Sequence, residues 1–210
     1  MTQKSAIGLA EQLQLRIDKE FRQQLDGMIT EMQEIACKFK IQQVQEKSPF
    51  RNVLSAATEP MSSIEAIKVF IRYQVGRKES SKVWKLTITE DGEKQFFADA
   101  VVRKIAGLEK TCETIFQSIQ SDLAKEMELL KDLPSQDPVS QDPSPQNLPS
   151  KDLSSKQSAL QELSEHLKQT KASLIKATHL NLAQLFLGYL SREHTALLGF
   201  QADKNFKAKS

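Results

Sequence analysis

The stretch FADAVVRKIAGLEKTCETIFQSIQSDLAKEMELL, residues 97–130, decides the fold of this chain. Its apolar residues recur every three or four positions, the spacing that places side chains on one face of an α-helix. They are Phe97, Val101, Ile105, Leu108, Cys112, Ile115, Ile119, Leu123, Met127 and Leu130. The pattern predicts a long helix over residues 93–131 that packs its apolar stripe against other helices.

A second stripe of the same kind lies near the N-terminus and predicts a helix over residues 5–40. Its members are Phe21, Leu25, Met28, Met32, Ile35 and Phe39. A helix with such a narrow stripe either faces the core of a bundle or forms the seam of a coiled-coil dimer. The few repeats favour the bundle, and the coiled coil stays open as the alternative.

Helical spacing returns after residue 157 and becomes denser towards Leu197. We therefore expect residues 106–131 and 157–182 to fold back on each other as an antiparallel pair of helices. Between them, residues 132–156 carry five prolines among Ser, Asp and Gln. Such a composition cannot bury enough apolar surface to offset its conformational entropy, so a disordered or extended loop is expected.

These patterns predict an all-α protein, a helical bundle with two or more long helices and a Pro-rich disordered loop. We expect a helical domain over residues 1–131, the loop over 132–156, C-terminal helices over 157–203 that pack back on the same bundle, and a basic tail over 204–210. The 210 residues are 39% hydrophobic and 27% charged, enough for one sizeable core. No segment approaches the roughly eighteen uninterrupted apolar residues of a membrane span, so a cytoplasmic protein without a membrane partner is expected.

Two short elements are expected between the long helices. Residues 51–57 read as a short helix, and Ser62 is a candidate N-cap for a helix that ends near Gly76, whose buried arc would include Ile67, Phe70 and Ile71. Residues 82–97 are ambiguous. A helix followed by a turn is favoured because an isolated hairpin is weakly stable, but alternating apolar residues and Asp91-Gly92 keep a two-stranded hairpin open.

Positive charge is concentrated in two windows. From Lys68 to Lys85 there are six cations and a single acid, and from Leu167 to Arg192 there are cations and no acid. Such surfaces attract phosphate backbones, although a solvated helix face has the same composition. The candidate nucleic-acid contacts from charge are Lys68, Arg72, Arg77, Lys78, Lys82, Lys168 and Lys171.

Catalytic and metal-binding motifs are missing from the sequence. His166, His179 and His194 are too far apart to form a local ligand pair on one helix turn, and we expect them at the surface or at an interface. Cys37 and Cys112 show no metal or redox spacing and fall among apolar positions, so both are expected to be buried thiols. Neither an enzymatic activity nor a cofactor is therefore expected.

Residues 50–78 carry a resemblance to a known family. The segment Arg51-Asn52-Val53-Leu54, followed by a helix that ends in Tyr73-Gln74-Val75-Gly76-Arg77, resembles the small subunit of Csm-type (type III) CRISPR effector complexes. The resemblance implies a small all-helical, non-catalytic protein that stacks in copies along an RNA-guided antiviral complex.

The same resemblance implies partners and contacts. The partners would be the backbones of the guide RNA and the target RNA, other subunits of the complex, and further copies of the chain itself. Carried over by residue, the implied RNA contacts are Arg51, Arg72 and Arg77, whereas Lys68 and Lys78 are supported by charge alone. The competing hypothesis is a helical scaffold or adaptor that binds protein partners only, which would respond much less to salt than backbone binding does.

Overall fold

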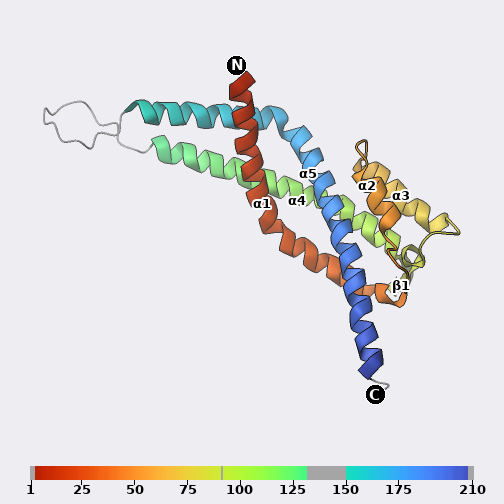
Figure 1. Ribbon diagram of the computed structural model, residues 1–210. Helices are drawn as coiled ribbons and strands as arrows, with labels where there is room; N and C mark the ends of the chain where they lie inside the picture. The colour runs from red at the N-terminus through yellow and green to blue at the C-terminus, as the bar shows by residue number, and fades with distance from the viewer. Residues whose placement is uncertain (1–2, 91, 132–149, 208–210) are drawn as a thin grey trace, which may run out of the picture. The chain divides into compact units, whose positions relative to one another are not determined.

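The computed structural model describes residues 3–90, 92–131 and 150–207 (Figure 1). Within these residues the chain forms five α-helices, two short 3₁₀ helices and one two-stranded sheet. In chain order they are α1 (Gln3–Lys38), η1 (Ile41–Gln43), α2 (Arg51–Thr58), α3 (Ile64–Gly76), η2 (Lys82–Lys85), β1 (Thr87–Glu90), β2 (Glu93–Phe96), α4 (Phe97–Lys131) and α5 (Ser150–Lys207). The prediction of an all-α fold with long helices is confirmed.

The chain divides into two compact units. The first unit takes its residues from Met1–Gln23 and Glu113–Leu174, and the second from Gln24–Cys112 and Ile175–Ser210. Helices α1, α4 and α5 each contribute residues to both units. Among the described helices, none has both the length and the apolarity needed to cross a membrane.

In the first unit, α4 and α5 run antiparallel, as the sequence predicts. The Gln157 side-chain amide donates to the Leu130 carbonyl at 3.0 Å, and Lys171 Nζ donates to Gln120 Oε1 at 3.0 Å. Residues later in α5 thus meet residues earlier in α4. The buried apolar side chains of this unit come from α1, α4 and α5 and include Leu13, Ile17, Ile115, Phe116, Ile119, Leu123, Leu163 and Leu167.

The beginning of α5 corrects the predicted loop. Residues 150–156 were expected to belong to the loop but are helical. Pro149 is the last proline of the segment, and no residue after it breaks a helix, so the helix can begin directly behind it. Residues 132–149, the rest of the predicted loop, lie outside the described residues. The predicted C-terminal helices are a single helix, which continues into the predicted basic tail as far as Lys207.

A bidentate ion pair links α1 to α4 in the first unit. Arg16 donates to both carboxylate oxygens of Glu126, at 2.8 and 2.7 Å. The hydrogen bond from Arg16 lowers the pKa of Glu126, and the same bond raises the pKa of Arg16. Because the pKa of Glu126 is lower in the folded state, its contribution to stability is present above the ordinary pKa of a glutamate and is lost as pH falls through the folded pKa.

Glu126→Gln is therefore expected to destabilise the protein at pH 7 but not in acid. The side chains of Arg16 and Glu126 are 28% and 43% exposed, so water screens the pair and the expected loss is about 0.5–1 kcal/mol. Urea unfolding of both proteins at pH 7 and at about pH 3 measures it. A difference between variant and parent that does not shrink in acid would contradict the assigned role of this pair.

The core of the second unit is an aromatic cluster. Ring centroids are 5.2 Å apart for Phe50 and Trp84, 5.4 Å for Phe39 and Phe97, and 5.7 Å for Trp84 and Phe97. The His194 ring lies 5.8 Å from that of Phe50. Edge-on and tilted arrangements of this kind suit the charge distribution of aromatic rings. The cluster brings together Phe39, directly after α1, Phe50, directly before α2, and residues of η2, α4 and α5.

A short β-hairpin corrects the favoured prediction for residues 82–97. β1 and β2 pair antiparallel with Thr87 opposite Phe96 and Glu90 opposite Glu93, so a helix followed by a turn is wrong and the alternative hairpin is confirmed. Gly92 has a φ of 79°, a conformation that glycine adopts without strain. Buried Trp84 and Phe97 flank the hairpin, so the core stabilises strands that are weak in isolation.

Helices α2 and α3 follow the sequence closely. The short helix is confirmed, and α3 ends at Gly76 as expected. Its N-cap is Ser63, whose hydroxyl accepts from the Ala66 N–H at 3.2 Å, rather than the predicted Ser62. The buried side of α3 consists of Ile67, Ile71 and Gln74, whereas Phe70 is only half-buried and the prediction that it belongs to the core is wrong.

Buried polar residues bring two further corrections. His179 and His194 are buried, not at the surface, because each ring Nε2 is hydrogen-bonded to a backbone carbonyl, Ile105 O at 2.7 Å and Val44 O at 2.9 Å. Cys112 is a buried free thiol as predicted, but Cys37 is exposed. Its neighbour Ala36 takes the buried position of that helix turn instead.

Candidate nucleic-acid interface

Helix α3 presents one face to solvent in the second unit. Ile67, Ile71 and Gln74 are buried on one side of it, while the other side carries exposed residues at helical spacing. These exposed residues are Glu65, Ala66, Val69, Arg72, Tyr73 and Gly76, which we call the α3 face. This face combines a cation, an aromatic ring and an aliphatic side chain.

The C-terminal end of α3 is closed by side chains from the segment that follows it. Lys85 Nζ donates to the Arg77 carbonyl at 2.6 Å, and the Ser80 hydroxyl donates to the same carbonyl at 3.0 Å and also to the Gln74 carbonyl. A cation here counters the negative end of the helix dipole. The charge of Lys85 is thus used inside the fold.

The predicted cations differ in how their charge is balanced. Lys68 bonds Glu65 at 2.7 Å, and its side chain is only 18% exposed, so it is a weaker candidate for binding phosphate than the sequence predicts. The remaining predicted cations of this unit have no carboxylate within ion-pair distance among the described residues. They are Arg51, Arg72, Lys78 and Lys82, which are exposed, and Arg77, which is half-buried.

The structure places these cations along a short run of elements. Arg72 lies on the α3 face, Arg77 is the C-cap residue of α3, and Lys78 follows it. Lys82 begins η2, where its backbone N–H donates to Glu46 Oε1 at 3.1 Å. Arg51 is the first residue of α2. The α3 face and the cations at its C-terminal end therefore form one candidate interface, with Arg72, Arg77 and Lys78 as its positive groups.

Lys168 and Lys171 belong to the first unit and are not part of this interface. Lys168 is exposed, whereas Lys171 is half-buried and its Nζ is already bonded to Gln120. The structure therefore divides the predicted contacts between two units.

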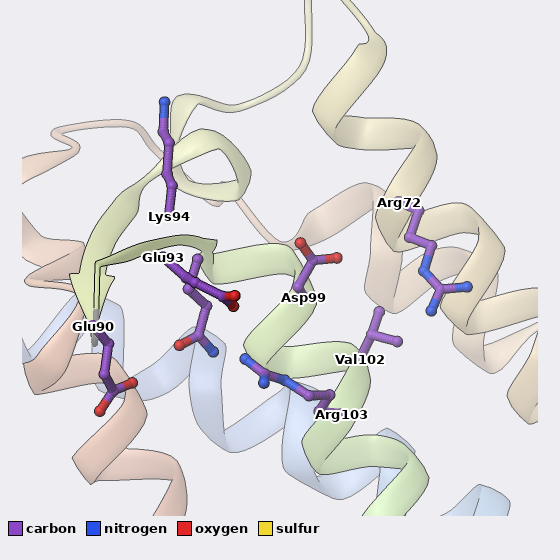
Figure 2. A pocket seen from close by; sticks show the side chains of 8 residues that line it. Arg72, Glu90, Glu93, Lys94, Asp99, Val102 and Arg103 are labelled. Carbon is purple, nitrogen blue, oxygen red and sulfur yellow. The ribbon is translucent and has the colours of Figure 1, made fainter.

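A cleft of about 530 Å³ lies beside Arg72 in the second unit (Figure 2). Arg72 comes from α3, and the other lining residues come from the hairpin and the first turns of α4. These residues are Glu90, Glu93, Lys94, Gln95, Asp99, Val102 and Arg103. Sequence reasoning missed Lys94 and Arg103, and the alternating pattern before Asp91-Gly92 was the signal that could have placed Lys94 on a strand.

The charges within this cleft largely balance. The Glu90 carboxylate forms an ion pair with Lys38 at 2.7 Å. The Gln95 amide bridges Glu90 and the Arg103 guanidinium when its nitrogen faces Glu90 and its oxygen faces Arg103. Glu93 and Asp99 are further carboxylates in the lining of the cleft, together with Arg72 and Lys94. Because these acids would repel a phosphate, the α3 face and its C-terminal end suit a nucleic-acid backbone better than the cleft does.

No metal centre emerges from the part of the chain that the structure describes. No group of three or more His, Cys, Asp or Glu side chains there could hold a metal ion. In each of the two buried histidines, His179 and His194, the ring Nε2 is hydrogen-bonded to a backbone carbonyl.

Comparison with known proteins adds no relative: no protein-family model, no curated protein and no solved structure matches this chain.

Proposed function

We propose that this chain is a non-catalytic, cytoplasmic helical subunit of a type III CRISPR RNA-guided complex, and that it contacts the backbones of guide and target RNA. The observation that carries the proposal is the group Arg72, Arg77 and Lys78 at the C-terminal end of α3, which form no ion pair with a carboxylate among the described residues. Other subunits of that complex and further copies of the chain are its protein partners in this proposal.

Physical chemistry supports a backbone contact at this place. A guanidinium is permanently charged and matches phosphate geometry with two parallel hydrogen bonds. Lys85 and Ser80 bond the Arg77 carbonyl, which directly follows the helix, and Ser80 also bonds the Gln74 carbonyl within it. The segment Tyr73-Gln74-Val75-Gly76-Arg77, which carries the family resemblance, coincides with this cationic end of the helix.

The test is the combined substitution Arg72→Ala with Arg77→Ala. Each lost phosphate contact should lower the slope of log affinity against log salt by about 0.7 on a single strand, so the double variant should lose about 1.4. Affinity at low salt should fall for all sequences alike, because phosphate contacts carry no base information. Fluorescence anisotropy of labelled RNA over a salt series measures both, with the full chain alone and with the assembled complex.

A matched control removes the same charge elsewhere. Arg22→Ala with Lys131→Ala takes from the first unit two exposed cations that form no ion pair among the described residues, and should leave the salt slope close to that of the parent. Lys68→Ala should have a smaller effect than Arg72→Ala, because Glu65 already balances its charge. If affinity and slope are unchanged in the Arg72/Arg77 variant while folding and assembly are intact, the RNA-binding role is rejected and a scaffold that binds proteins only remains.

A further inference from the structure

Tyr73 is an aromatic residue that α3 leaves in solvent. It is 56% exposed, and Val69, one turn earlier on the same face, is 63% exposed. The Tyr73 ring packs beside the half-buried Phe70 ring. Their ring centroids are 6.2 Å apart and their planes are inclined by 45°. The face therefore offers a ring that is supported by Phe70 and still open to a ligand.

Cations lie on both sides of Tyr73 along the chain. Arg72 precedes Tyr73 directly, and Arg77 and Lys78 follow about one helix turn later. In a nucleic-acid strand, each base is likewise flanked by a phosphate on either side. Aromatic rings next to cations are the arrangement with which proteins hold unpaired bases, the ring by stacking and the cations through the backbone.

We infer that the α3 face binds single-stranded RNA, with one unpaired base stacked on Tyr73 while Arg72 and Arg77 hold the adjoining phosphates. The inference rests on the proposed function and names its ligand class. A duplex does not fit this role, because its bases are already stacked on one another.

The size of the apolar surface argues against a protein partner at this position. A stable protein interface buries roughly 800 Å² on each partner, around a core depleted of charged residues. Here the exposed apolar side chains are Ala66, Val69 and Tyr73, and the charged residues Glu65 and Arg72 lie on the same helix face. A flat base between two phosphates needs only one ring and two cations.

The experiment compares the parent with Tyr73→Leu and Tyr73→Phe, using a uridine oligonucleotide, the same backbone with abasic sites throughout, and an RNA duplex. Tyr73→Leu should bind the uridine strand about five-fold or more weakly, whereas Tyr73→Phe should stay within about two-fold because the ring is kept. Neither variant should change the salt slope, since no charge is lost. For the parent, removal of the bases should weaken binding by a similar factor.

The double comparison isolates the stacking. On the abasic strand and on the duplex, the parent and Tyr73→Leu should bind with the same affinity, because neither ligand offers an unpaired base. Leu129→Ala, which truncates another exposed apolar residue, should change none of these affinities. Circular dichroism and thermal unfolding should match the parent for each variant, because Tyr73 and Leu129 are exposed.

Three outcomes would overturn the inference. Normal, salt-dependent binding that is insensitive to Tyr73→Leu would overturn it and leave the proposed function standing. An equal loss on uridine, abasic and duplex RNA would show that Tyr73 acts through the helix and not through a base. If no RNA binds to the parent, even in the assembled complex at low salt, the proposed function fails together with the inference.

Discussion

Phe50→Ala is expected to lower the free energy of unfolding by about 3–5 kcal/mol. Phe50 is fully buried, and its ring contacts those of Trp84, Phe97 and His194 at centroid distances of 5.2, 6.2 and 5.8 Å. Truncation would open a cavity among side chains from several elements, which cannot all move to fill it. The variant therefore loses both the free energy of burying the ring and the packing contacts around the cavity that the ring leaves.

Urea unfolding followed by circular dichroism measures this loss. Phe200→Ala is the control. Because Phe200 is 66% exposed, its truncation should lower the free energy of unfolding only slightly. Phe70→Ala should fall between the two, since the structure leaves Phe70 half-buried although the sequence suggested a core position. Equal effects at Phe50 and Phe200 would contradict the placement of the aromatic cluster at the centre of the second unit.

His194→Ala is expected to cost about 3 kcal/mol. The side chain is 1% exposed, and its Nε2 is bonded to the Val44 carbonyl at 2.9 Å. The substitution removes a ring from the core and leaves a buried carbonyl without its partner. A buried acceptor that loses its hydrogen bond carries the full cost of its desolvation, so this loss should exceed that of an ordinary surface change.

Two further substitutions separate the parts of this effect. His194→Gln keeps an amide N–H that can donate to Val44 and should recover part of the stability that His194→Ala loses. His166→Ala is the matched control, because His166 is only half-buried, and it should cost less than about 1 kcal/mol. If the two alanine variants unfold at the same urea concentration, the hydrogen bond and packing of His194 contribute nothing measurable.

Much of the fold could be predicted from local sequence. The stripes in residues 21–39 and 97–130 lie in α1 and α4, and the predicted short helix corresponds to α2, because helical spacing is a property of neighbouring residues. The hairpin was not the favoured prediction, because its stability comes from Trp84 and Phe97 in a core assembled from distant segments. The burial of His179 and His194 was missed for the same reason, as their partners lie 74 and 150 residues away.

The candidate interface shows the same division. Its cations could be predicted, because charge is read directly from residue type, and so could the helix that carries Arg72. The sequence could not indicate that Glu65 balances Lys68, that the Arg77 carbonyl engages Lys85, or that Tyr73 is exposed above Phe70. These features depend on which way each side chain faces after the helices have packed.

The sequence by itself determined the all-α class, the places of the long helices and the excess of positive charge around α3. Only the tertiary structure decided that the chain forms a hairpin between η2 and α4, which cations keep an unbalanced charge, and which aromatic ring stays in solvent. The physical reason is the range of the interactions. Helical periodicity acts over a few residues, whereas burial and charge pairing depend on groups that folding brings together from distant parts of the chain.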